Sequence, residues 1–131
     1  MRRLVPLILL PALLAGCSDG RDRSHLAQTS WRFVRIDGQQ PGSADAGLTF
    51  DSGKIGIQVG CNRMGGPWRV DSNRLVAGPL AQTEMACADP AWTQEAAVGA
   101  LLVATPRMNL SGDRMTLQSS GHTAELVRIG D

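Results

Sequence analysis

Three cysteines and two histidines are the side chains of this sequence best suited to nucleophilic, redox or metal chemistry. They are Cys17, Cys61, Cys87, His25 and His122. Two histidines that lie far apart in the chain do not supply the closely spaced ligand set of an imidazole metal site. The sequence also has no phosphate-binding glycine loop, nucleophile elbow or zincin motif. We therefore predict a protein that is not an enzyme and that carries no metal or cofactor.

We predict that Cys17 lies at the end of an export signal. Two arginines follow the first residue, residues 4–14 form an uncharged apolar run, and Leu14-Ala15-Gly16-Cys17 resembles the lipobox of bacterial lipoprotein signals. A helix needs about 20 apolar residues to cross a bilayer, so this run is typical of a cleaved signal instead. We predict that residues 1–16 are removed and that the Cys17 thiol takes up a lipid. The alternative is an ordinary secretory signal that happens to end in a cysteine.

The mature chain has a nearly balanced charge. Cleavage removes two of the 13 basic residues and none of the 12 acidic ones, which leaves a net charge of −1. The basic residues are arginines apart from Lys54 and form no stripe, so nucleic acid is not an expected partner. Residues 17–28 are polar without apolar periodicity, which predicts a flexible tether from lipid to domain.

The residue after Cys17 bears on location. Ser18 stands where an aspartate commonly retains lipoproteins in the inner membrane. We therefore expect a cell-envelope protein, anchored by its lipid in the outer membrane and facing the periplasm. We further expect a monomer whose partner is an envelope protein or a small ligand.

Cys61 and Cys87 are the thiols that are left once Cys17 is lipidated. Export takes them into a compartment where thiols oxidise, so we predict a Cys61–Cys87 disulfide. Two alternatives stay open: a pair of reduced cysteines buried as small apolar side chains, or a thiol–imidazole pair with His122. Geometry separates them, because bonded cysteines need Cα atoms about 4.4–6.8 Å apart.

Short strands separated by turn residues must position these side chains. Ile55, Ile57 and Val59 alternate with Gly56 and Gln58, which is the pattern of a strand with one buried face. Turn residues recur about every 8–12 positions, as in small barrels and sandwiches. Further strands are expected around residues 31–36, 48–50, 68–70, 75–76, 108–110, 115–117 and 124–129.

Residues 90–105 do not follow this pattern of strands and turns, because they are rich in alanine and leucine. Asp89 is a natural N-cap, Pro90 suits the first helical position, and Pro106 stops the pattern. We predict one amphipathic helix whose apolar face packs against the sheet. The residues of that face are Ala91, Val98, Leu101, Leu102 and Thr105.

Two spaced motifs resemble those of a known family. Gly60-Cys61-Asn62 is followed by Gly66 and Trp68, and then by Thr83-Glu84-Met85-Ala86-Cys87. Together they resemble the META domain, or HslJ-like, family, from about Trp31 to Val127. Trp68 stands where the family usually has a tyrosine.

The resemblance has implications for fold and role. It implies a mainly β fold over residues 29–129, a single small domain with a β-barrel-like antiparallel sheet and one packed α-helix. It also implies a cell-envelope role tied to heat shock, stress and drug tolerance, and no known reaction.

The motif residues fit either structure or binding. Gly60 and Gly66 permit close backbone approaches, Asn62 tolerates a left-handed turn, and Thr83 can brace the turn after Leu80. The alternative is a binding surface. The candidate site residues are Gly60, Asn62, Arg63, Gly66, Trp68, Thr83, Glu84 and Met85.

Two function classes remain. The first is a non-enzymatic envelope module that binds or stabilises a partner during stress. The second is a periplasmic inhibitor or a barrel lipoprotein that binds a small apolar ligand. An inhibitor needs an exposed loop, for which residues 63–67 are the candidate, and a carrier needs an apolar interior of about 300 Å³ or more.

Overall fold

The computed structural model describes residues 25–119 and 121–130, together with Pro11. Cys17, the predicted tether up to residue 24 and, Pro11 apart, the predicted signal peptide lie outside the described residues. Within the described part, no helix is long and apolar enough to cross a membrane.

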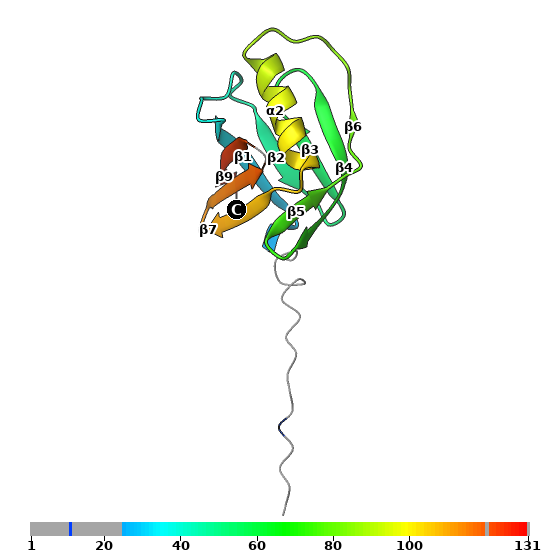
Figure 1. Ribbon diagram of the computed structural model, residues 1–131, viewed down its shortest axis with the longest axis vertical. Helices are drawn as coiled ribbons and strands as arrows, with labels where there is room; N and C mark the ends of the chain where they lie inside the picture. The colour runs from blue at the N-terminus through cyan, green and yellow to red at the C-terminus, as the bar shows by residue number, and fades with distance from the viewer. Residues whose placement is uncertain (1–10, 12–24, 120, 131) are drawn as a thin grey trace, which may run out of the picture.

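Antiparallel strands form a closed barrel that carries one helix (Figure 1). Eight strands follow one another in the order β3-β2-β1-β9-β8-β7-β5-β4, and β4 pairs back with β3 to close the barrel. The sequence prediction of a mainly β, barrel-like fold with one packed helix is therefore confirmed. The strands are β1 (Thr29–Ile36), β2 (Gly47–Phe50), β3 (Lys54–Gln58), β4 (Arg63–Asp71), β5 (Arg74–Ala77), β6 (Ala81–Gln82), β7 (Arg107–Ser111), β8 (Arg114–Ser119) and β9 (His122–Ile129); the helix is α2 (Ala91–Val103).

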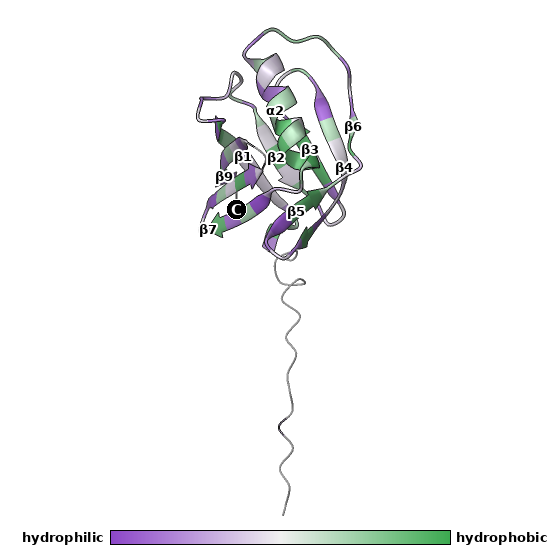
Figure 2. Ribbon diagram, viewed as in Figure 1, coloured by the Kyte–Doolittle hydropathy of each residue, from purple (hydrophilic) through white to green (hydrophobic). Residues whose placement is uncertain are grey.

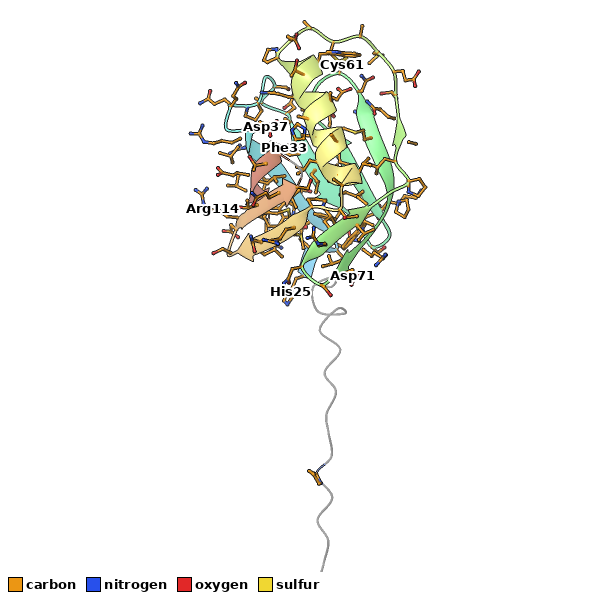
Figure 3. The ribbon with its side chains drawn as sticks, viewed as in Figure 1. His25, Phe33, Asp37, Cys61, Asp71 and Arg114 are labelled. Atoms are coloured by element: carbon orange, nitrogen blue, oxygen red, sulfur yellow. A yellow bond between two sulfur atoms is a disulfide. The ribbon has the colours of Figure 1, made fainter. Side chains whose placement is uncertain are left out.

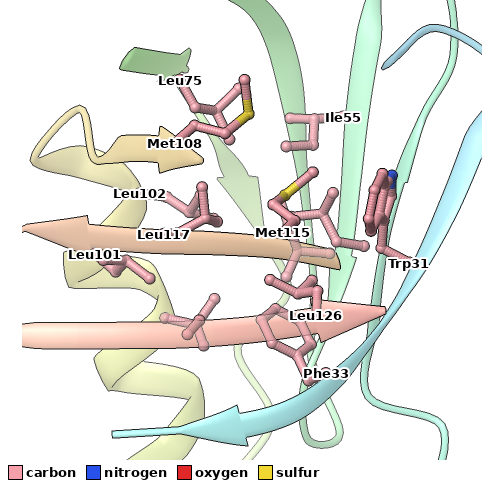
Figure 4. Close-up of a cluster of buried hydrophobic side chains, with 14 of the residues drawn as sticks. Trp31, Phe33, Ile55, Leu75, Leu101, Leu102, Met108, Met115, Leu117 and Leu126 are labelled. Carbon is pink, nitrogen blue, oxygen red and sulfur yellow. The ribbon is translucent and has the colours of Figure 1, made fainter. Parts of the chain in front are cut away.

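Alternating side chains fill the barrel. Trp31 pairs with Leu48, and Leu48 pairs with Ile57, so three buried side chains form one row across β1, β2 and β3. Figure 4 shows such apolar side chains meeting between the strands and the helix. Burial of alternate residues is the main reason for this register, because a slip by one residue would turn each apolar side chain to solvent.

The pairing between β5 and β7 is the shortest in the barrel order. The two strands share one register pair, Arg74 with Arg107. Two backbone hydrogen bonds support it, from Leu75 N to the Pro106 carbonyl (3.0 Å) and from Met108 N to the Asn73 carbonyl (2.7 Å). Helix α2 packs against β1, β5, β8 and β9 and turns apolar residues toward the core (Figures 1 and 2).

The domain starts before the expected boundary at residue 29. Leu26 has 0% of its surface exposed, and the hydroxyl of Thr29 donates to its carbonyl. The predicted tether therefore does not reach residue 28. A single apolar pair inside a polar stretch has no periodicity, which is why the sequence pattern missed it. In Figure 3, His25 lies at one end of the domain and Cys61 at the other.

Several local expectations need correction. Helix α2 ends at Val103, and its N-cap is Pro90. Asp89 still contributes, because its carboxylate accepts a hydrogen bond from the N–H of Thr93 at 3.1 Å. Strand β6 was not predicted, since two exposed residues carry no alternation. Leu110 lies in β7, where the sequence predicts a strand, but its side chain is exposed near the β7–β8 turn.

Candidate functional site

Asn62 organises the region in which the two motifs meet. It lies between β3 and β4, and only 1% of its surface is exposed. Its side-chain oxygen accepts the N–H of Met85 at 2.7 Å, and its side-chain amide donates to the Met85 carbonyl at 2.8 Å. Asn62 thus holds both backbone polar groups of Met85, as a neighbouring strand would. The sequence prediction placed Asn62 in this region, and the structure gives it a structural task.

Thr83 extends the same bracing. Its hydroxyl donates to the side-chain oxygen of Asn62 (3.0 Å) and accepts the N–H of Arg63 (3.0 Å). The N–H of Thr83 donates to the carbonyl of Arg63 at 3.1 Å. The segment after β6 is therefore tied to the start of β4 through backbone and side chain together.

Glu95 brings a negative charge beneath the segment. Only 4% of its surface is exposed, and Oε1 accepts hydrogen bonds from the side-chain amides of Asn62 (2.7 Å) and Gln82 (3.2 Å). Its other oxygen, Oε2, accepts the backbone N–H of Asn62 at 3.2 Å. Among the described residues no cation forms an ion pair with Glu95. Three N–H donors therefore satisfy this buried carboxylate, as buried charge requires.

The Cys61–Cys87 disulfide is present, as the sequence predicted. The Cα atoms lie 5.9 Å apart, within the range for bonded cysteines. The alternative thiol–imidazole pair is wrong, because the His122 ring contacts the carboxylate of Asp37 at 2.8 Å. The disulfide joins the β3–β4 connection to the segment that precedes α2.

Gly60 allows the connection to pass close to α2. A Cβ at this position would lie 3.0 Å from Oε2 of Glu95 and 3.1 Å from the Cβ of Ala91. Such contacts are tighter than nearly all Cβ contacts in proteins. Gly60 is therefore needed for the helix to approach.

The outer side of this segment presents apolar side chains to solvent. Met85 is 55% exposed and Trp92, in the first turn of α2, is 50% exposed. They border an open hollow of about 430 Å³. The hollow is lined by Asn62, Gln82, Thr83, Glu84, Met85, Ala86 and Trp92. We call these seven residues the motif surface.

The remaining motif residues lie elsewhere. Gly66 is in β4, where a Cβ would overlap the carbonyl oxygen of Pro79. Trp68 is buried in the core, where it packs edge-on against Phe50 with ring centroids 4.8 Å apart and donates its indole N–H to the Asp51 carbonyl at 3.0 Å. Both residues therefore have structural roles and do not contribute to the motif surface.

The sequence that folds into this site matches a known family. The META domain family model matches residues 24–131. The chain belongs to the META domain family. Its family assignment therefore rests on nearly all the described residues as well as on the two motifs.

Solved structures share the fold of this META domain. An NMR structure of a protein from Burkholderia xenovorans is similar with a TM-score of 0.71 and 24% sequence identity, covering 97% of this chain and 100% of that one. A second NMR structure has a TM-score of 0.71 and 20% identity, covering 80% of this chain and 92% of the other. No curated protein matches the sequence.

Two residues of this META domain site were not predicted as site residues. Glu95 lies four residues after Ala91 and three before Val98, so its position on the buried face could be found from helical spacing. Trp92 does not lie on that face of the helix, so helical spacing also predicts that its side chain is exposed. What spacing does not show is that both meet the Thr83–Cys87 motif.

Proposed function

We propose that this protein is a lipid-anchored cell-envelope module without enzymatic activity, which binds a partner through its motif surface during envelope stress. The observation that carries the binding role is a clamped backbone beneath exposed apolar side chains. Asn62 fixes Met85 from below, whereas the Met85 and Trp92 side chains face solvent. The stress role rests on membership in the META family, and the anchor rests on the sequence before Cys17.

The clamp makes the motif surface suitable for binding. Ordering a loop when a complex forms costs free energy, and a segment that is already fixed avoids much of that cost. Methionine and tryptophan are both enriched at protein interfaces, and tryptophan is among the residues that contribute most to affinity. An exposed Met85 beside an exposed Trp92 therefore supports a binding role more than a purely structural one.

The charge of the segment indicates the character of the partner. Residues 83–92 include two acidic side chains, Glu84 and Asp89, and no basic one. A protein surface that offers an apolar contact bordered by basic side chains would complement it. Raised ionic strength should then slow association more than it speeds dissociation.

The structure offers less support for the second function class. Residues 63–67 are not a loop, because they form the first part of β4 and pair with β3. Core side chains such as Leu117 and Leu126 pack between the strands and the helix (Figure 4). The hollow of about 360 Å³ beside Trp31 is open to solvent, and polar residues such as Gln58 and Arg63 are part of its lining. The inhibitor and the apolar-ligand carrier are therefore not the functions that we propose.

In-cell photocrosslinking tests the binding role. A photoreactive amino acid at Met85 should give a discrete adduct with an envelope protein, and Trp92→Ala should reduce its yield. The control is the same probe at Leu110, another exposed apolar residue, on β7. Equal adducts from both positions, or an adduct insensitive to Trp92→Ala, would refute the motif surface as the binding site.

The anchor is tested separately. Wild-type protein should fractionate with membranes and carry a lipid on its N-terminal cysteine by mass spectrometry, whereas Cys17→Ala should leave an uncleaved or mislocalised chain. Recovery of soluble, unmodified wild-type protein beginning at Ser18 or later would contradict the lipoprotein proposal.

A further inference from the structure

The disulfide and the buried carboxylate of Glu95 lie together. The sulfur atoms of Cys61 and Cys87 and a carboxylate oxygen of Glu95 are all within 4.8 Å of one another. The closest approach of Glu95 is from Oε2 to the sulfur of Cys87, at 3.8 Å. The carboxylate of Glu95 accepts hydrogen bonds from Asn62 and Gln82 of the motif surface, and it lies beside the disulfide as well.

The spacing is that of ligands on one metal ion. A tetrahedral Zn²⁺ with Zn–S of about 2.3 Å and Zn–O of about 2.1 Å holds its sulfur and oxygen ligands about 3.6 Å apart. The 3.8 Å between Cys87 and Glu95 is already close to that value. Once the disulfide is opened, only the sulfur of Cys61 has to turn away, to about 3.8 Å from that of Cys87.

The surroundings orient these ligands. Oε1 of Glu95 accepts hydrogen bonds from the side-chain amides of Asn62 and Gln82, and Oε2 accepts the backbone N–H of Asn62 while lying 3.8 Å from the sulfur of Cys87. The backbone N–H of Cys61 donates to the sulfur of Cys87 at 3.1 Å. Hydrogen bonds of this kind from surrounding residues fix the orientation of metal ligands and raise affinity about 10–100-fold.

We propose that the reduced protein binds one zinc ion through Cys61, Cys87 and Glu95, so that disulfide and metal are alternative occupants of one site. A dithiol reductant supplies two electrons and two protons, becomes a disulfide itself, and leaves two thiols. Zn²⁺ then displaces the two thiol protons and binds two sulfurs and one carboxylate oxygen. Both cysteines are partly exposed, so solvent water can complete the tetrahedron.

A zinc site departs from the sequence prediction of a protein without metal, and it does so in the reduced chain alone. In the disulfide form the sulfurs are bonded to each other and offer no thiolate ligand. The buried charge of Glu95 then rests on three N–H donors, and a cation would neutralise it in the reduced form.

Metal binding by purified, folded protein tests the site. The reduced chain, kept without oxygen, should bind one equivalent of Zn²⁺ or of Cd²⁺ in equilibrium dialysis, and Cd²⁺ should give the ultraviolet band of cadmium–thiolate bonds. The oxidised chain should bind at least about 100-fold more weakly. X-ray absorption of the zinc form should report two sulfur ligands with oxygen ligands beside them.

Variants assign the third ligand. Glu95→Gln should weaken binding to the reduced chain by at least the about 10–100-fold that loss of a residue supporting a metal ligand causes, whereas Glu125→Gln, a matched change on the exposed face of β9, should leave it unchanged. Circular dichroism of each reduced protein establishes that it is folded. The proposal is wrong if oxidised and reduced chains bind equally, if urea-unfolded reduced chain binds as tightly, or if folded Glu95→Gln keeps full affinity. If Glu95→Gln does not fold, the ligands counted by X-ray absorption of the wild-type zinc form test the site instead: a zinc ion without two sulfur ligands contradicts the proposal.

Discussion

Asn62→Ala should strongly destabilise this domain. The asparagine is buried and its side chain makes four hydrogen bonds to nitrogen and oxygen atoms: two to the backbone of Met85, one with the hydroxyl of Thr83 and one to the carboxylate of Glu95. Its amide also lies 3.9 Å from the sulfur of Cys87. Alanine removes all four and keeps the backbone of the β3–β4 connection. The change therefore measures how far a single side chain holds the motif region together.

The size of the loss can be estimated from these contacts. A hydrogen bond between neutral groups contributes about 0.5–1.5 kcal/mol and one to a charged group about 1.5–3 kcal/mol. Met85 and Thr83 are exposed, so water can replace part of their loss, whereas Glu95 is buried. We expect a decrease of about 3–5 kcal/mol in the free energy of unfolding. The stability of a small domain is about 5–15 kcal/mol, so this is a large share.

Urea unfolding under non-reducing conditions, followed by tryptophan fluorescence, measures the change. In a separate thermal unfolding experiment, the melting temperature should fall by at least about 12 °C, at about 4 °C per kcal/mol. Asn62→Asp should cost at least as much at neutral pH, because it turns a carboxylate oxygen toward Glu95. Asn109→Ala, the same change on the exposed side of β7, should shift stability by less than about 0.5 kcal/mol.

One result would refute the reasoning. If Asn62→Ala costs less than about 1 kcal/mol while the m-value is unchanged, the motif region does not depend on this side chain. The disulfide and the pairing of β6 with β4 would then be enough to hold it.

Three further predictions concern other parts of the domain. Replacing both Cys61 and Cys87 by serine should lower the free energy of unfolding by about 3–4 kcal/mol, which is the chain-entropy value for a loop of this length. Urea unfolding without reductant measures this change, and an unchanged free energy of unfolding would contradict the chain-entropy account. Gly66→Ala should cost about 1–3 kcal/mol because its Cβ overlaps the Pro79 carbonyl; Gly53→Ala, with open space around its Cβ, is the control, and equal effects would contradict this. The pKa of Asp37 is lowered: burial alone would raise it, but hydrogen bonds from the Thr123 N–H and the His122 ring, with the charge of that ring, outweigh burial. A carboxylate with a lowered pKa stabilises the fold at pH values above its unfolded pKa, and this stabilisation is lost as pH falls through the folded pKa. Asp37→Asn should therefore lower the free energy of unfolding near pH 6 but change it little in strong acid. A difference between variant and wild type that does not depend on pH would contradict this prediction.

The sequence predicted most of the barrel because its signals are local. The alternation of Ile55 and Ile57 and the turn at Asp51-Ser52-Gly53 are both set by neighbours in the chain, and the Asp51 carboxylate indeed accepts the N–H groups of Gly53 (3.0 Å) and Lys54 (2.7 Å). Strand β6 was missed because its pairing with β4 is all that makes it a strand. Local patterns do not show such non-local pairing.

The candidate site was predicted only in part for the same reason. The motifs identified Asn62, Thr83 and Met85, but their common partner Glu95 lies on a helix later in the chain. An acidic residue on an apolar helix face is visible in the sequence. Which donors satisfy it depends on how the helix docks, and this is a property of the whole fold.

The positions of His25 and Cys61 at opposite ends of the domain give the molecule a polarity (Figure 3). If the lipid is on Cys17, the chain enters the domain from the membrane side at His25. The turn at Asp71, near His25 in Figure 3, then lies toward the headgroups, and the end with Cys61 and Met85 projects into the aqueous space. With a lipid on Cys17, this polarity would favour partners that approach Met85 from the aqueous side over lipids of the anchoring leaflet.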